Sequence, residues 1–174
     1  MPRFGYRAGV TTGVTPPDFG DKGFIGGLSV EFDLGASHAL DPGAIHQSVV
    51  ALHVPINHRW SAPSVSTQIA ALRLLLLSDS RQTRGEAGAY FAKAARGQIS
   101  LFVKTESTDV IATLIKLKEE VESAVYEEGT DRMRLVIEGA SESHLVAKEL
   151  ADASVGVILT RVRPFPSEWE GRRM

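Results

Sequence analysis

Ser100-Leu-Phe-Val-Lys-Thr-Glu106 opens the stretch of sequence that decides the fold. It is predicted to form a buried strand, and similar apolar runs return at Arg134-Leu-Val-Ile-Glu138 and at Val155-Gly-Val-Ile-Leu-Thr160. Between these runs, the spacing of apolar residues predicts helices over Thr108–Glu127 and Glu142–Ala153. Strands that alternate with helices and carry near-continuous apolar runs indicate a parallel sheet covered on both faces.

The polar residues that end these strands are the first candidates for a functional site. In α/β folds of this kind, ligands bind at the C-terminal ends of the strands. The search therefore narrows to Lys104–Glu106, Glu138–Ser141 and Thr160–Arg163. If the strands run parallel, these three ends lie at a common rim.

Length and composition exclude several classes of protein. The chain has 174 residues, which suffices for one domain but not for a complete eight-stranded barrel of about 250 residues. A net charge of -2 argues against a nucleic-acid or membrane partner held by electrostatics, and the absence of cysteine excludes disulfides and thiolate metal sites. With no apolar run long enough to span a bilayer and no visible signal peptide, we expect a cytoplasmic protein.

The chain is predicted to form a single domain over residues 1–174. Residues 1–63 are expected to be mainly irregular, residues 64–160 to form regular β/α units, and residues 161–174 to form a tail. Within the first part, Leu28–Leu34 alternates apolar and polar residues and predicts a half-buried strand, whereas Ser48–Val54 is ambiguous between strand and helix.

Three helices are predicted in the regular part before the second strand. Ser64 is a suitable N-cap for a helix over Val65–Leu77, and a second helix is expected over Arg81–Gly97. The third, after Glu106, has an apolar stripe with helical spacing, formed by Val110, Leu114, Leu117, Val121 and Val125. The other faces of this helix are expected to carry its charges, at Lys116, Lys118, Glu119 and Glu122.

Lys104 and Glu106 lie two residues apart on a strand, so their side chains are expected to share a face. They are candidates for binding a divalent metal through oxygen ligands, and the alternative is a solvated pair of opposite charges. Glu138 is a candidate metal ligand or general base. The alternative there is a tight turn at Gly139, followed by Ser141 as the cap of the next helix.

Two histidines bear on the site. His144 lies in the first turn of the helix after Glu138, within reach of the same edge, although a surface histidine near a helix start is the simpler interpretation. His53, within an apolar run, is expected to be packed rather than catalytic.

Five segments, taken in order along the chain, resemble the amidohydrolase superfamily of metal-dependent hydrolases, in particular its imidazolonepropionase-like branch and the fungal relatives of that branch. They are Arg7–Thr12, Gly26–His38, Ser107–Ile111, Arg134–Leu145 and Val155–Pro166. The resemblance implies an α/β fold, a partial TIM-type (β/α) barrel of mostly parallel strands with covering helices, apparently truncated at both ends.

The resemblance also implies site residues. Glu106 and Lys104 stand where the family has histidine ligands, which makes them the predicted metal ligands, with zinc as the expected ion. Glu138 and His144 are the predicted catalytic residues. The family's first-strand His-x-His pair and its late-strand Asp have no counterpart in this chain.

The resulting expectation is a metal-dependent hydrolase of amide, cyclic amide or ester bonds, degenerate or inactive as this fragment, with a small-molecule substrate. The alternatives are a non-catalytic barrel fragment and a small doubly wound domain that binds a ligand without metal. Open sheet edges would favour association into a homo-oligomer.

Overall fold

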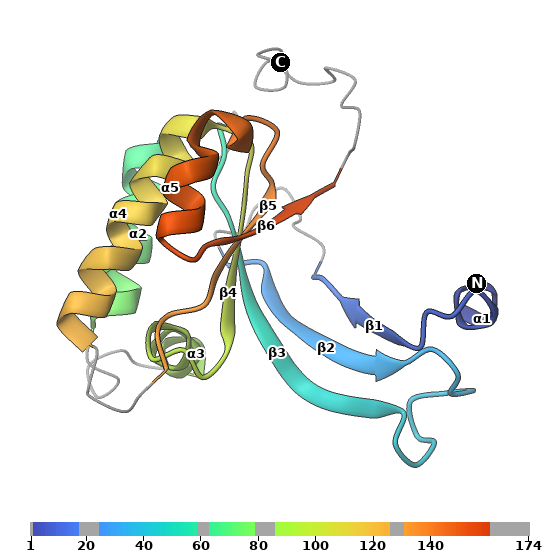
Figure 1. The fold of residues 1–174 in the computed structure, drawn as a ribbon. Helices are drawn as coiled ribbons and strands as arrows, with labels where there is room; N and C mark the ends of the chain where they lie inside the picture. Colours follow the sequence, from blue (N-terminus) through green and yellow to red (C-terminus); the bar gives the residue numbers. More distant parts are fainter. Residues whose placement is uncertain (1, 18–24, 59–62, 79–85, 126–130, 161–174) are drawn as a thin grey trace.

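A six-stranded sheet forms the framework of the protein in this computed structural model, which describes residues 2–17, 25–58, 63–78, 86–125 and 131–160. The strands lie side by side in the order of the chain, from β1 to β6 (Figure 1). Their bounds are β1 Thr12–Thr15, β2 Gly27–Asp33, β3 Ile45–Pro55, β4 Ser100–Thr105, β5 Leu135–Gly139 and β6 Gly156–Leu159.

The sheet has an antiparallel part and a parallel part. β1 pairs with β2 and β2 with β3 in antiparallel fashion, whereas β3, β4, β5 and β6 all run parallel. Parallel neighbours need crossover connections, and helices supply them here. The described helices are α1 Pro2–Arg7, α2 Val65–Leu77, α3 Glu86–Ala95, α4 Thr108–Val125, the 3-10 turn η1 Ser143–Val146, and α5 Ala147–Asp152.

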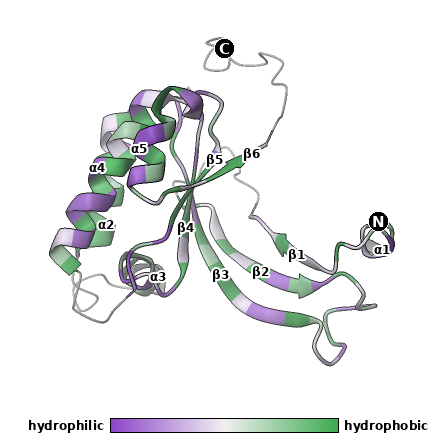
Figure 2. Cartoon of the chain, viewed as in Figure 1, coloured by the Kyte–Doolittle hydropathy of each residue, from purple (hydrophilic) through white to green (hydrophobic). Residues whose placement is uncertain are grey.

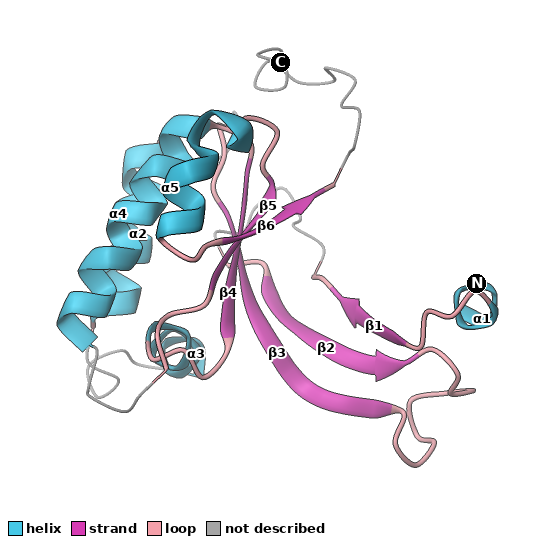
Figure 3. Cartoon of the chain, viewed as in Figure 1, coloured by secondary structure: helices cyan, strands magenta, loops and turns pink. Residues whose placement is uncertain are grey.

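The helices that connect the parallel strands cover one face of the sheet, not both as predicted (Figure 3). Along β4 and β5 the residues alternate strictly between buried and partly buried. Leu101, Val103 and Ile137 point to the helices and are fully buried with Leu114 of α4. Their neighbours Phe102, Lys104, Val136 and Glu138 point to the opposite face, which stays partly exposed. The apolar runs therefore come from one fully buried face and one half-buried face.

The sheet is curled, with its helices on the outside, so that it forms part of an α/β barrel (Figure 1). β3, β4 and β5 carry their helix-facing residues into one continuous core, whereas the four residues of β6 are exposed. The fold is thus the partial barrel of mostly parallel strands that the family resemblance implies, with three of its five strand pairings parallel.

Two helices match their predictions closely. α2 spans Val65–Leu77, and the Ser64 side chain accepts a hydrogen bond from the Thr67 N–H, as an N-cap does. α4 begins at Thr108 and buries its apolar stripe against the sheet. Lys118, which the sequence places off the apolar stripe of α4, is nevertheless buried, and its ammonium pairs with the Glu122 carboxylate.

The first 63 residues are more regular than predicted. The described part of this region contains three strands, and the ambiguous run Ser48–Val54 is part of the long strand β3. The expected strand Leu28–Leu34 corresponds to β2, and it pairs with β3. β3 joins the two parts of the sheet because its C-terminal half also pairs with β4. The predicted tail, residues 161–174, lies outside the described residues.

Coloured by hydropathy, helix α4 carries both hydrophobic and hydrophilic residues along its length, as a helix with one buried face does (Figure 2). None of the helices that the structure describes is long and apolar enough to cross a membrane.

Candidate functional site

Lys104 and Glu138 lie side by side at the C-terminal end of the parallel strands. They are register partners on β4 and β5, and Pro55 of β3 and Ile158 of β6 complete the same row. Both charged side chains point to the face that the helices leave uncovered, and both are partly buried. The predicted common rim is confirmed, because the trailing ends of β4, β5 and β6 meet along one edge of the sheet.

His53 approaches the same row from β3. It pairs in register with Phe102, which lies two residues before Lys104 on β4. The His53 ring packs edge-on against the Phe102 ring, with 4.8 Å between the ring centroids. The His53 Nδ1 lies 4.0 Å from a Glu138 carboxylate oxygen. Burial lowers the pKa of His53 below its usual value, so the imidazole is neutral at neutral pH. His53 is packed, as expected, but its proximity to Glu138 was missed.

The alternation of side chains along β3 indicates which face of the sheet His53 occupies. Leu52 and Val54 face the core, so the histidine between them must face the other side, together with Lys104 and Glu138. Because the sequence of Ser48–Val54 is ambiguous between strand and helix, this alternation does not by itself place His53 beside Glu138.

Glu106 turns away from this row and holds the loop that follows β5. Its Oε2 accepts hydrogen bonds from the Ser141 N–H at 2.9 Å and from the Ser141 hydroxyl at 2.7 Å. The carboxylate lies over Gly139, where an added Cβ would be only 2.9 Å from Glu106 Cδ. Gly139 has a φ of 94°, which fits the predicted tight turn. The expected capping role of Ser141 is wrong, since the N-cap of η1 is Glu142 and the Ser141 hydroxyl is used on Glu106.

The same loop is attached to the start of α4. Glu142 is buried, and its Oε2 accepts a hydrogen bond from the Thr108 N–H at 2.9 Å. The Thr108 hydroxyl donates in turn to the Glu142 carbonyl at 3.1 Å. A carboxylate at a helix N-terminus satisfies a backbone donor and interacts favourably with the helix dipole. The loop after β5 is therefore held by α4 and by Glu106 together.

His144 lies on η1 at the outer side of this loop. It is exposed, and its Nδ1 is 3.3 Å from the Ser141 carbonyl oxygen. This position is at the rim, as the sequence predicts, but outside the row formed by Lys104 and Glu138.

The described residues do not assemble a metal site. Within those parts of the chain, no three histidine, aspartate or glutamate side chains are grouped so that they could hold one ion. Glu106, a predicted ligand, uses one oxygen on Ser141, and Lys104 contributes an amine rather than a carboxylate. The binding of zinc stays a prediction.

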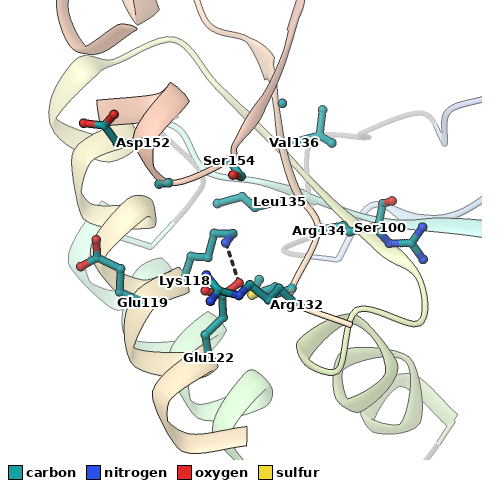
Figure 4. A pocket seen from close by; sticks show the side chains of 13 residues that line it. Ser100, Lys118, Glu119, Glu122, Arg132, Arg134, Leu135, Val136, Asp152 and Ser154 are labelled. Carbon is teal, nitrogen blue, oxygen red and sulfur yellow. Dashed lines mark hydrogen bonds and ion pairs between the residues drawn. The ribbon is translucent and has the colours of Figure 1, made fainter. Parts of the chain in front are cut away.

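A cavity lies at the opposite end of the strands from this rim (Figure 4). It has a volume of about 490 Å³ and is lined by the starts of β4 and β6, at Ser100 and Gly156. Lys118 points into it and binds Glu122, with 2.6 Å between Nζ and Oε1. Because it borders strand starts rather than strand ends, this cavity is separate from the rim.

Comparisons with known proteins bear on the kind of site. No family model matches the chain. A curated protein, amidohydrolase tasK of Hapsidospora irregularis, is 28% identical over 206 aligned residues, which cover 98% of this chain. The chain is amidohydrolase-like. It spans only 21% of the length of that amidohydrolase relative.

A solved structure supports the amidohydrolase-like fold. The crystal structure of an amidohydrolase from Thermotoga maritima MSB8 superposes with a TM-score of 0.74, at 17% identity. The match covers 94% of this chain and 45% of that one. At this identity the likeness concerns the fold alone, and this chain corresponds to somewhat less than half of that structure.

Proposed function

We propose that this chain forms the site of an amidohydrolase-type hydrolase, which cleaves carbon–nitrogen bonds of non-peptide amides or cyclic amides, or ester bonds. The observation that carries the proposal is the row of Lys104 and Glu138 at the strand ends, with His53 beside it. The curated relative, amidohydrolase tasK, supports the reaction class.

Glu138 is the proposed general base. Its side chain is 15% exposed, so a water molecule can reach the carboxylate from the uncovered face. When the water oxygen attacks the substrate carbonyl carbon, Glu138 accepts the proton that the water loses. Collapse of the tetrahedral intermediate breaks the carbon–nitrogen or carbon–oxygen bond, and Glu138 returns the proton to the leaving group.

Lys104 is the proposed electrostatic partner. During attack the carbonyl electron pair moves to oxygen, and the ammonium in the same row stabilises that negative charge. His53 is neutral and positions Glu138 from the side, because its buried ring limits where the carboxylate can move. His144, at the outer rim, is proposed to contact the substrate rather than to transfer protons.

The predicted zinc would add Lewis-acid polarisation of the carbonyl. The described residues do not group around an ion, so zinc would need ligands from outside these ranges. Metal analysis of the purified protein tests this separately: about one equivalent of zinc that is lost in Glu106→Ala would support the predicted ligand.

The central experiment compares Glu138→Gln with Glu119→Gln in assays of a panel of chromogenic amides, cyclic amides and esters. Glu119 is an exposed glutamate on α4, away from the strand ends, and serves as the matched control. Loss of a general base lowers turnover by about 100-fold or more. Equal turnover in the two variants would remove Glu138 from the mechanism.

The second candidate function is a non-catalytic barrel module that binds a small ligand or associates with itself. The exposed apolar strand β6 favours it. A correctly folded protein that turns over none of the panel, with or without added zinc, would favour this alternative.

A further inference from the structure

Ser141 carries a hydroxyl group at the rim, and this hydroxyl is hydrogen-bonded to a carboxylate. Its Oγ donates to Oε2 of Glu106 at 2.7 Å, and the Ser141 N–H donates to the same oxygen at 2.9 Å. Both residues are partly exposed. A hydroxyl within hydrogen-bond reach of a base, about 2.6–3.2 Å, is the arrangement that activates a serine as a nucleophile. The two residues therefore form a candidate nucleophile and base outside the row of Lys104 and Glu138.

The backbone before Ser141 makes a sharp turn at the end of β5. The strand ends at Gly139 with a φ of 94°, and Ala140 follows with a φ of 52°. A left-handed conformation is rare for alanine and persists only where its surroundings hold it. Ala140 is fully buried, and its N–H donates to the Thr105 carbonyl oxygen at 2.8 Å. Because η1 begins at Ser143, Ser141 lies on a tight connection from a strand to a helical turn.

The sequence of this turn resembles a nucleophile motif. Gly139–Ser143 reads Gly-Ala-Ser-Glu-Ser, which matches Gly-x-Ser-x-Gly except that a serine replaces the last glycine. In that motif the serine lies on a strained turn between a strand and a helix, at the edge of the sheet where the strands end. Ser141 has the same surroundings here, and the Glu106 carboxylate at 2.7 Å is a second, independent observation.

We propose that Ser141 is a nucleophile that takes up the acyl group of an ester or amide substrate, with Glu106 as its base. Ser141 Oγ attacks the carbonyl carbon while its proton moves to the Glu106 carboxylate. The carbonyl electron pair moves to oxygen, and the Lys104 ammonium at the same rim stabilises that charge. When the intermediate collapses, the bond to the leaving group breaks and Glu106 gives the proton to the leaving group. An ester of Ser141 remains.

Hydrolysis of this ester completes the cycle, and this step rests on the proposed function, because Glu138 is its base. Glu138 directly precedes Gly139, over which the Glu106 carboxylate lies. Water attacks the ester carbonyl carbon, and Glu138 accepts the proton that the water loses. The bond from the carbonyl carbon to Ser141 Oγ then breaks, and the proton returns to Oγ. One cycle consumes one water molecule and releases a carboxylic acid together with the alcohol or amine.

The alternative role for the Glu106–Ser141 pair is purely structural. In that case the carboxylate only holds the loop after β5, and the Ser141 hydroxyl is no more reactive than that of any other serine. The two roles differ in the chemistry of the hydroxyl, so a reagent that reacts with activated serines separates them.

The first test treats the purified 174-residue chain with a fluorophosphonate probe and locates the adduct by peptide mass spectrometry. We expect the adduct on Ser141 and none in Ser141→Ala. Ser143→Ala is the matched control, because it removes a serine from the same turn and should be labelled like the wild type. This test does not involve Glu138.

Glu106→Gln distinguishes the base from the loop contact. Glutamine keeps an oxygen that can accept the Ser141 N–H, but it is no longer a base. Labelling of Ser141 should therefore slow by about 100-fold or more, the effect of losing a general base. Circular dichroism and thermal melting show whether each variant is folded. If Glu106→Gln does not fold, the wild type, Ser141→Ala and Ser143→Ala still decide whether Ser141 is reactive.

The second test uses p-nitrophenyl acetate with Glu138→Gln. Because this variant lacks the base for hydrolysis but keeps Ser141 and Glu106, it should release nitrophenolate in a stoichiometric burst and then stop. Mass spectrometry should find one acetyl group on Ser141. Adding Ser141→Ala to Glu138→Gln should abolish both the burst and the acetyl group.

The two proposals fail separately. Steady turnover in Glu138→Gln, with Ser141 still labelled by the fluorophosphonate, would reject Glu138 as the base and retain Ser141 as the nucleophile. Turnover that is lost in Glu138→Gln, with no adduct on Ser141 in either test, would reject Ser141 and retain Glu138. The Ser141 proposal is also overturned if the wild type is labelled only at other residues, or if folded Glu106→Gln is labelled as fast as the wild type.

Discussion

The Nδ1 atom of His53 lies 4.0 Å from a Glu138 carboxylate oxygen, although the two residues belong to strands on either side of β4. The imidazole is buried and the carboxylate is partly exposed, so the pair links the interior of the sheet to its uncovered face. Parallel pairing of β3, β4 and β5 creates this proximity, since it places the same end of each strand at the same edge.

Burial of His53 predicts a pH-dependent stability. Its pKa is lowered in the folded protein, whereas the unfolded chain takes up the proton near the usual value of 6.5. Below that pH the unfolded state binds more protons, so the free energy of unfolding should fall as pH decreases, by up to about 1.4 kcal/mol per pH unit. Urea unfolding between about pH 5 and 7.5 measures this slope.

His53→Gln should flatten that slope, because it removes the buried imidazole. An equal slope in wild type and His53→Gln would assign the pH dependence to other groups.

Gly139→Ala should destabilise the protein by about 1–3 kcal/mol. Two causes act together, since a φ of 94° is strained for alanine and the new Cβ would overlap the Glu106 carboxylate. Gly43→Ala separates them, because Gly43 has a φ of 79° but no atom within 4 Å of an added Cβ. Chemical denaturation should show a smaller loss for Gly43→Ala, and equal losses would mean that the contact with Glu106 contributes nothing.

The hydrogen bonds between Glu106 and Ser141 should be measurable as a coupling. In a double-mutant cycle of Glu106→Gln and Ser141→Ala, we expect a coupling energy of about 1–2 kcal/mol, since a charged acceptor is involved. The same cycle on Lys148 and Asp152, an exposed ion pair on α5, serves as the reference and should give a smaller value. Additive effects at Glu106 and Ser141 would contradict the role given to the carboxylate.

Lys118→Met should destabilise the protein by about 1–3 kcal/mol, because it leaves the partly buried Glu122 carboxylate without its ammonium partner. Lys118→Met combined with Glu122→Leu should recover much of the loss, since apolar residues of similar volume can replace a buried ion pair. Lys116→Met, at an exposed position of the same helix, is the control. A double variant less stable than Lys118→Met alone would show that the pair itself is stabilising.

The parallel part of the fold could be predicted from the sequence because its signals are local. The apolar runs, the Ser64 cap and the spacing of apolar residues on α4 each act within one element. Lys118 shows the limit of this reasoning. Periodicity assigns a charged residue to solvent, but a glutamate four residues later can satisfy the charge in a buried position.

The candidate site could be predicted only in part. The meeting of Lys104 and Glu138 follows from the parallel order of strands, which the alternation of strands and helices indicates. The pairing of Glu106 with Ser141 does not follow from either residue's neighbours along the chain. It depends on how the loop after β5 folds back over the end of β4.

By itself, the sequence determined the helices α2 and α4, the strands β4 and β5 and the polar side chains at the ends of these strands, because propensity and periodicity are properties of neighbouring residues. Tertiary structure alone decided that His53 lies beside Glu138, that Glu106 serves a loop, and that the helices cover one face only. These outcomes depend on strand register and on the curl of the sheet, and both are set by contacts between residues far apart in the chain.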